Sequence, residues 1–209
     1  SWHREAFNLA RKIKATLFST PFSIKALKFL EQFNPPIYKI ASFEITDLKL
    51  IYEIAKTRKP IIMSTGMSSI TEIKNAIKLI NKFHNKIILL YCVSGYPTPE
   101  NETNINTIKT FKNIFKKNLI GLSDHSNNIF SSLAAVPLGV VAIEKHFKVS
   151  NRINSHDKSF SLNNLEFNKL KKYTQSIHNN LGSSKIKLKN SEKKSLIFRR
   201  SIFAKKKIK

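Results

Sequence analysis

The chain of 209 residues has little cysteine, glycine, proline or acid. Its single cysteine, Cys92, excludes an internal disulfide framework and a zinc cluster built on cysteines. Five glycines and seven prolines exclude collagen-like and Pro/Gly low-complexity chains. The longest uncharged stretch, residues 126–143, contains Asn, Ser, Pro and Gly, so we expect no membrane span and no membrane partner. The remaining composition, 41% hydrophobic, suits one domain with a real core or part of a larger one.

Acids are also outnumbered, because 13 Asp and Glu stand against 37 Lys and Arg, a formal net charge of +24. Such a charge suggests a polyanion as partner. Genome composition is a simpler account, since Lys, Asn and Ile, which A/T-rich codons encode, number 31, 20 and 27. The lysines are scattered, except that residues 183–209 hold 11 Lys or Arg and one Glu. No zinc-finger or RNA-recognition signature is present, so we expect no nucleic-acid partner.

Short apolar runs alternate with amphipathic segments. Six runs occupy residues 15–20, 37–42, 60–66, 86–94, 119–125 and 140–147. Their spacing of about 20–30 residues predicts strand–helix units with a parallel sheet. Helix signals lie between them: Ser69 and Glu72 form a capping box, Asp47 suits an N-cap, and Gly182 follows an apolar stripe at residues 170–181. We predict a domain over residues 1–182 and a basic linker over 183–209.

Six units fit either a doubly wound sheet or a (β/α)8 barrel with two units missing. Nearly every predicted strand ends in polar residues, as in β/α barrels, where functional groups gather at the carboxyl ends of many strands. No GxGxxG or P-loop follows a strand, so a nucleotide-binding sheet lacks its signature. Scarce acids and histidines also concentrate at these ends: Glu44, Asp124, Glu144, Asp157, His125, His146 and His156. The pattern favours the incomplete α/β barrel.

His125 and His146 end two consecutive predicted strands. Adjacent strands lie about 5 Å apart, so the two imidazoles can bind one metal, or can form a hydrogen-bonded structural pair. Strand alternation puts Ser123 on the face of His125, and Glu144 on the face of His146. Two protein ligands leave positions for water and substrate, which suits catalysis better than a structural metal.

Lys39 ends an apolar strand and needs an anion if it faces a barrel interior. Hydroxyl residues end the other strands: Thr20, Ser42, Ser64, Ser94 and Ser123. A lysine ringed by hydroxyls predicts a phosphate or carboxylate cradle, although each serine alone is an ordinary turn or cap residue. Tyr96 lies in a stiff Tyr-Pro-Thr-Pro loop, and Asp157 lies in a later loop, where it can bind substrate hydroxyls or form an Asx turn.

Seven strings, taken in order, resemble the sialic-acid-synthase family, whose members condense phosphoenolpyruvate with an amino-sugar aldehyde. They are Phe18-Ser-Thr-Pro-Phe22, Tyr38-Lys-Ile-Ala-Ser-Phe-Glu44, Ser64-Thr-Gly-Met67, Tyr96-Pro-Thr-Pro99, Gly121-Leu-Ser-Asp-His125, Ile143-Glu-Lys-His-Phe147 and Phe160-Ser161. Each is weak alone, but the ordered set covers nearly the whole chain and is specific. The Ala-Ser-Phe-Glu string resembles pseudaminic acid synthases more than the Gly-Ser-Gly-Glu of N-acetylneuraminate synthases.

The resemblance implies a (β/α)8 barrel that makes a nine-carbon nonulosonic acid of the pseudaminic type and releases phosphate, with N-acetylneuraminate or legionaminate synthesis as alternatives. It implies a divalent metal on His125 and His146, most often manganese, with magnesium or cobalt as alternatives. Four groups of positions match family sites: Lys39, Thr20, Ser42, Ser64 and Ser123 for phosphoenolpyruvate, Ser94 where the family has an Asn in that role, Tyr96 and Asp157 for the sugar, and Glu44 for a motif acid near the site.

The family's first two strands, with a catalytic Glu and a second phosphoenolpyruvate-binding Lys, have no match here. Its C-terminal antifreeze-like domain, whose Arg reaches the partner subunit's site, has none either. We therefore expect an internal fragment (strands three to eight) or a gene decayed at both ends, inactive alone, from a cytoplasmic enzyme of cell-surface polysaccharide synthesis or flagellin glycosylation that is homodimeric at full length. Two rivals remain: another metal-dependent β/α-barrel enzyme, such as an aldolase, and a non-catalytic basic fragment that binds polyanions.

Overall fold

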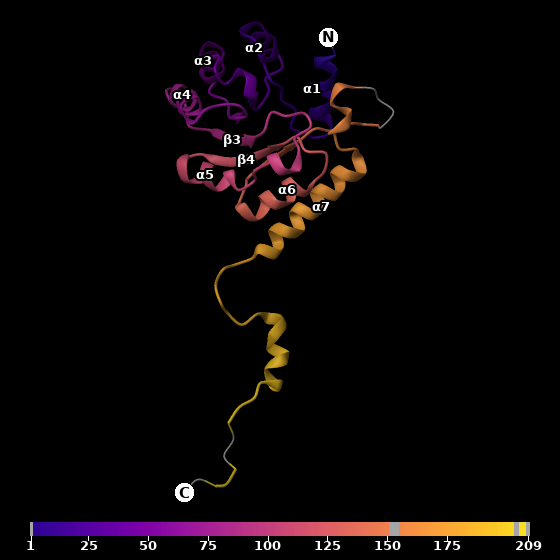
Figure 1. Cartoon of the computed structure of the whole chain (residues 1–209). Coiled ribbons are helices and arrows are strands. Elements are labelled where there is room, and N and C mark those ends of the chain that lie inside the picture. The colour runs from indigo at the N-terminus through magenta and orange to yellow at the C-terminus, as the bar shows by residue number, and fades with distance from the viewer. Residues whose placement is uncertain (1, 151–154, 203–204, 208–209) are drawn as a thin grey trace.

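The computed structural model describes residues 2–150, 155–202 and 205–207. Within these ranges, one parallel sheet has five strands in the order β1-β2-β3-β4-β5 and curls into a half-barrel. Helices α2 to α7 lie around the outside of this sheet (Figure 1). The predicted α/β fold, an incomplete barrel, is therefore confirmed.

The strands are short and mostly buried. They are β1 (Tyr38–Ile40), β2 (Ile61–Ser64), β3 (Ile87–Cys92), β4 (Leu119–Asp124) and β5 (Ile143–Lys145). Each pairs with the next one along the chain, and the register places Ser123 beside Glu144 and Asp124 beside Lys145. Because all strands are parallel, their polar carboxyl ends meet at one edge of the sheet.

Each strand is followed by a helix. The α-helices are α1 (His3–Lys12), α2 (Ile24–Glu31), α3 (Leu48–Lys56), α4 (Ile70–Ile80), α5 (Thr107–Ile114), α6 (Phe130–Ala135) and α7 (Asn164–Leu181). Short 3-10 helices are η1 (Ser42–Glu44), η2 (Glu100–Glu102), η3 (Val136–Leu138), η4 (His156–Ser159) and η5 (Asn190–Phe198). No helix in the described ranges is long and apolar enough to cross a membrane.

The predicted helix signals form as hydrogen bonds. Ser69 N donates to Glu72 Oε2 at 2.7 Å and Glu72 N donates to Ser69 Oγ at 3.2 Å, which completes the capping box of α4. Leu50 N donates to Asp47 Oδ1 at 2.9 Å at the start of α3. Gly182 is the C-cap of α7 with a φ of 51°, a conformation that glycine adopts at little cost.

The main core lies between the outer face of the sheet and the helices. Ile61 of β2, Leu89 of β3, Ile51 and Ile54 of α3, and Ile80 of α4 are all 0% exposed. Burial of one such side chain contributes about 1.5–3 kcal/mol, so this packing fixes the strands that carry the polar ends. The stripe predicted on α7 is only partly covered, because Leu170 is buried while Tyr173 and Leu181 are 43% and 48% exposed.

The first predicted strand, residues 15–20, is wrong as a full strand. It is reduced to one parallel bridge between Ser19 and Tyr38, where Lys39 N donates to Ser19 O at 3.3 Å. Among the described residues this segment pairs on one side only, and residues 11–16 are exposed. This single bridge is too short a pairing to make residues 15–20 a strand.

Beyond Gly182 every described residue is exposed, and the segment leads away from the half-barrel (Figure 1). Helix η5 forms within the stretch predicted as a linker. Residues 203–204 and 208–209 of that predicted linker lie outside the described ranges.

Gly121 of β4 lies where two strands approach closely, so Gly121→Ala should destabilise the fold. An added Cβ would lie 2.7 Å from the Ala142 carbonyl oxygen, which is held in place because Leu122 N donates to it at 2.9 Å. Overpacking of this kind costs about 1–3 kcal/mol. The unfolding midpoint in urea measures it. The control is Gly95→Ala, whose Cβ would lie 3.7 Å from its nearest neighbours, an ordinary van der Waals contact. Equal midpoints for the two variants would contradict this expectation.

Candidate active site

Lys39 reaches from β1 into the interior at the carboxyl ends of the strands, as the sequence predicts. Its side chain is 9% exposed, and its Nζ donates to Ser64 Oγ of β2 at 2.7 Å. The anion that a buried lysine requires is Glu144 of β5, whose Oε2 lies 3.5 Å from Nζ. Ser123 of β4 donates to Glu144 Oε1 at 2.6 Å. Four side chains from β1, β2, β4 and β5 therefore form one polar cluster.

More hydroxyl groups meet beside this cluster. Gly66 N donates to Ser42 Oγ at 3.1 Å, and Cys92 Sγ lies 3.5 Å from Ser42 Oγ and 3.8 Å from Ser94 Oγ. Gly66 leaves room for these side chains, because a Cβ at this position would lie 2.1 Å from Ser94 Oγ and the serine would have to move. Burial acts to raise the pKa of the Cys92 thiol, but hydrogen bonds from His125 and Ser42 outweigh it, and the pKa falls below its ordinary value.

Thr20 is half-buried and directly follows the Ser19 bridge to β1. It therefore ends the segment that lies beside Lys39, as the sequence predicts for a strand-end hydroxyl. Its assignment to phosphoenolpyruvate stays a prediction.

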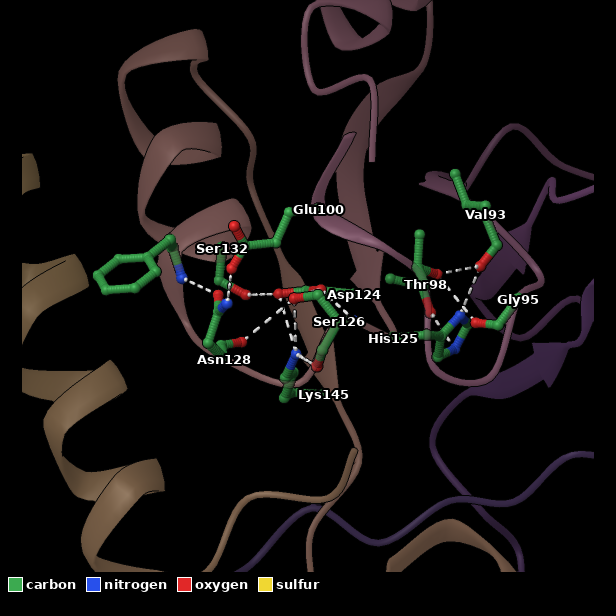
Figure 2. Close-up of polar contacts among 12 residues, drawn as sticks. Val93, Gly95, Thr98, Glu100, Asp124, His125, Ser126, Asn128, Ser132 and Lys145 are labelled. Atoms are coloured by element: carbon green, nitrogen blue, oxygen red, sulfur yellow. Dashed lines mark hydrogen bonds and ion pairs between the residues drawn. The ribbon is translucent and has the colours of Figure 1, made fainter. Parts of the chain in front are cut away.

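The imidazole of His125 is oriented by a backbone carbonyl. His125 Nδ1 lies 2.8 Å from Val93 O, and because a carbonyl only accepts, Nδ1 carries the hydrogen and donates. The lone pair is then on Nε2, which lies 3.4 Å from Ser123 Oγ. The loop that supplies this carbonyl is itself tied down, since Thr98 Oγ1 donates to Gly95 O at 2.9 Å and Thr98 N donates to His125 O at 3.0 Å (Figure 2).

A carboxylate orients the imidazole of His146 in the same way. Its Nδ1 lies 3.2 Å from Asp157 Oδ2, which again leaves the lone pair on Nε2. The His125 and His146 ring centroids are 5.3 Å apart with an interplanar angle of 68°. Burial, followed by the neighbouring charge of His125, holds the pKa of His146 below its ordinary value.

These two histidines fit a shared divalent metal. Metal-binding histidines usually donate their second N–H to a carbonyl or a carboxylate, and Val93 and Asp157 supply one of each. Two imidazoles on one ion, at about 2.0–2.2 Å per bond, have ring centres about 5 Å apart. Within the described residues no group of three or more His, Cys, Asp and Glu is arranged to hold a metal, so His125 and His146 are the two donors that this part of the chain brings together.

Protonation of the two rings differs. Burial lowers the pKa of His125, but its hydrogen bonds to Cys92 and to the Val93 carbonyl outweigh burial and leave the pKa above its ordinary value. Metals bind neutral imidazole, so the low pKa of His146 favours metal binding and the raised pKa of His125 opposes it.

An aromatic wall closes one side of the histidine pair. The Tyr96 ring centroid lies 4.3 Å from that of His125, as expected for a residue of the site, and is half exposed. Phe160, which is 2% exposed, lies 4.8 Å from His146 and 5.5 Å from Tyr96 by ring centroids. Phe160 belongs to one of the matching strings, but no pattern in the sequence predicts a role for it.

Glu44 follows β1 on η1, with one oxygen that has no hydrogen-bond partner. This atom, Oε2, is buried and finds no partner among the described residues, which is rare for a carboxylate oxygen. Burial raises the pKa of Glu44, while the nearby Lys39 acts in the opposite direction. A carboxyl group with a raised pKa keeps its proton to a higher pH than a solvated one, which suits a group that gives and takes protons.

Asp124 is the last residue of β4, at a strand end as the sequence predicts, but its side chain points to the opposite side of β4 from Ser123 and His125. There it lies 3.1 Å from Lys145 Nζ and accepts from Ser132 Oγ of α6 at 2.6 Å (Figure 2). Side chains alternate along a strand, and Asp124 falls between the two inward residues.

Five parallel strands with helices outside, and with Lys39, Glu144 and two histidines at the strand ends, define a β/α-barrel protein with a polar site at the usual edge. A model of the NeuB family matches residues 1–186. The chain belongs to the NeuB family.

Individual relatives match this chain over nearly its whole length. The chain is 41% identical to the pseudaminic acid synthase of Helicobacter pylori over 97% of its own length, and 38% identical to the N,N'-diacetyllegionaminic acid synthase of Campylobacter jejuni over 99%. It spans 60% and 63% of the lengths of these two relatives. A crystal structure of N-acetylneuraminic acid synthetase from Leptospira borgpetersenii, in complex with citrate, superposes with a TM-score of 0.85 at 34% identity over 94% of this chain and 70% of that one.

Proposed function

We propose that the protein condenses phosphoenolpyruvate with an amino-sugar aldehyde to give a nonulosonic acid and free phosphate. The observation that carries the proposal is the position of Lys39, buried in a cluster with Ser64, Ser123 and Glu144 from three other strands, beside two histidines that each present Nε2. Such a lysine binds a phosphate or carboxylate, and the neighbouring histidines suit a metal for a carbonyl. The similarity to two enzymes named as synthases of sugar acids supports the proposal.

The proposed reaction forms one carbon–carbon bond and breaks one carbon–oxygen bond. Carbon three of phosphoenolpyruvate attacks the aldehyde carbon, and the aldehyde oxygen takes a proton to become a hydroxyl. Water adds to carbon two and loses a proton. The bond from carbon two to the phosphate oxygen then breaks, which leaves a ketone and free phosphate. A divalent metal, when bound, supplies Lewis acidity to the aldehyde.

The residues of this chain act by holding and by moving protons. Lys39, Ser64 and Ser123 hold phosphate and carboxylate oxygens, so that much of the rate comes from positioning. His125 and His146 hold the metal. Glu44, with its unpaired buried oxygen, exchanges the proton of the attacking water.

The remaining predicted site residues contribute contacts. Thr20, Ser42 and Ser94 add hydroxyl groups toward phosphoenolpyruvate. Tyr96 contacts the sugar, and Asp157 both orients His146 and faces sugar hydroxyls.

The sugar is proposed to be the doubly acetamido, trideoxy precursor of pseudaminic acid. Phe43 lies between Ser42 and Glu44 on η1 and is 62% exposed, so its ring can offer an apolar surface to a deoxygenated sugar. Glycine at this position would leave space and backbone for a sugar hydroxyl instead.

Phosphate release tests both proposals in a version extended to the full length of the relatives. With manganese and phosphoenolpyruvate, we expect release that requires an amino sugar, a product heavier by the three-carbon acid, and a preference for the trideoxy sugar over N-acetylmannosamine. The 209-residue chain alone is expected to be inactive, because its described sheet is open at β1 and β5.

Other outcomes would assign another function. A carbon–carbon product without phosphate release would indicate an aldolase. Strongly salt-dependent binding of nucleic acid, with no binding of manganese or phosphoenolpyruvate, would indicate a polyanion-binding protein. That alternative has one surface in its favour, a groove of about 670 Å³ whose lining includes Lys74, Lys78, Lys82, Lys116 and Lys117. Preference for N-acetylmannosamine would refute the sugar assignment alone.

A further inference from the structure

We propose that the buried ion pair of Asp124 and Lys145 is a positioning device that sets the separation of His125 and His146, and so the affinity of the metal site. The inference rests on the proposed function, because it assumes that the two histidines bind a metal. Asp124 and Lys145 touch neither the substrates nor the metal, and they lie on the other side of the strands.

The pair is built into the interior. The Asp124 and Lys145 side chains are 2% and 1% exposed, and Nζ lies 3.1 Å from Oδ2. The two residues are register partners on β4 and β5, and each directly precedes one of the histidines. The pair is therefore a side-chain link between the two strands immediately before the metal-binding residues.

Hydrogen bonds fix both partners in one arrangement. Asp124 Oδ1 accepts from Ser126 N at 2.9 Å and from Ser126 Oγ at 2.7 Å, and Oδ2 accepts from Ser132 Oγ at 2.6 Å. Lys145 Nζ donates to Ser126 O at 2.5 Å. Figure 2 shows this cluster on one side and the His125 contacts with Val93 on the other. The carboxylate is saturated with donors, so it holds the ammonium, the turn after His125 and α6 together.

Backbone pairing holds β5 and His146 in the chain but does not orient their side chains. The strand has three residues and pairs with β4, and beyond it Leu162 N donates to His146 O and Lys148 N donates to Leu162 O, both at 2.9 Å. Consecutive side chains in an extended segment point to opposite faces, so a rotation of the backbone that moves Lys145 also moves His146. By fixing Lys145 against β4, the pair fixes the ring of His146 relative to that of His125.

Stability alone does not account for this pair. Apolar residues of similar volume in place of a buried ion pair are often as stabilising or more so, because both charges lose their hydration on burial. An apolar pair has no fixed donor–acceptor geometry, whereas the ion pair defines the distance between two atoms. Geometry is what a two-histidine metal site needs from its surroundings.

Manganese binding to the purified 209-residue chain tests the inference, with the dissociation constant measured by electron paramagnetic resonance. We expect Lys145→Met and Asp124→Asn each to weaken binding about 10- to 100-fold, the range typical of outer-shell partners. Lys145→Arg, which keeps the charge, should bind nearly as tightly as the unsubstituted chain. Lys59→Met is the matched control, because it breaks another lysine ion pair, with Glu31 at 2.7 Å, at the amino end of β2.

The double variant Asp124→Asn/Lys145→Met separates positioning from folding. It carries no unpaired buried charge, so it should unfold at nearly the temperature of the unsubstituted chain, yet its manganese affinity should stay low. Full manganese affinity in this variant, or in Lys145→Met, would overturn the inference.

The proposed function fails by a different result. If the unsubstituted chain binds no manganese, or binds it equally well after His125→Ala, the metal site itself is wrong, and the positioning inference is overturned with it. If binding requires His125 but ignores the ion pair, only the positioning inference is overturned.

Discussion

Replacing His125 with alanine is expected to abolish metal-dependent turnover in a full-length version of the protein. In the proposed metal site His125 and His146 each supply one imidazole, so loss of His125 would leave His146 Nε2 as the only histidine donor of that pair. Manganese affinity should fall by more than about 100-fold, the upper end of the range for outer-shell partners. Phosphate release and a manganese titration measure the two effects.

His178→Ala is the control for this variant, because His178 is exposed on α7 and far along the chain from the site. It should leave both manganese affinity and turnover unchanged. Unchanged turnover in His125→Ala would mean that the metal sits elsewhere or that none is needed.

Replacing Lys39 with methionine is expected to weaken phosphoenolpyruvate binding about 10- to 100-fold. Hydrogen bonds to charged groups are worth about 1.5–3 kcal/mol, and 1.4 kcal/mol is a factor of ten in affinity. Stability should change less, because the Glu144 side chain is 39% exposed and keeps its bond from Ser123 at 2.6 Å, so water can replace the lost ammonium. A calorimetric titration with phosphoenolpyruvate measures the affinity.

Lys59→Met serves as the control here too, because Lys59 forms an ion pair yet lies before β2, at the opposite end of the sheet from the site. It should bind phosphoenolpyruvate as the unsubstituted protein does. A Lys39→Met variant with unaltered phosphoenolpyruvate affinity would show that Lys39 only neutralises Glu144 and does not bind phosphoenolpyruvate.

Much of the fold could be predicted because its signals are local. A capping box needs only Ser69 and Glu72, three residues apart, and a buried parallel strand needs only an apolar run between turns. Residues 15–20 have such a run, but a strand also needs neighbours to pair with. In the described residues that segment pairs with β1 alone, through Ser19. The length of a strand depends on such tertiary contacts, which an apolar run in the sequence does not show.

The site was predictable where alternation along a strand decides, and less so elsewhere. Parity puts Ser123 on the face of His125 and Glu144 on the face of His146, and in the structure Ser123 Oγ donates to Glu144 Oε1 at 2.6 Å. The same rule puts Asp124 on the other face of β4, where its Oδ2 lies 3.1 Å from Lys145 Nζ. The sequence gives no signal for the contact of Val93 O with His125, because every residue has the same backbone carbonyl. Only the geometry of the fold shows which carbonyl meets the imidazole. Phe160 is distant in sequence and joins the wall only through tertiary packing.

The alternation at the ends of β4 and β5 also limits how the length of this chain can vary. Asp124 and His125 are adjacent residues whose side chains face opposite sides of the sheet, and the same holds for Lys145 and His146. Deleting one residue within β4 would turn every later side chain of the strand over, sending a carboxylate toward the metal and an imidazole toward α6. Insertions and deletions are therefore compatible with the site in the turns and helices between these strands, where no parity has to be kept, and incompatible with it inside the strands. In β4, with six residues, and β5, with three, the function of each side chain therefore depends on an unchanged residue count within the strand.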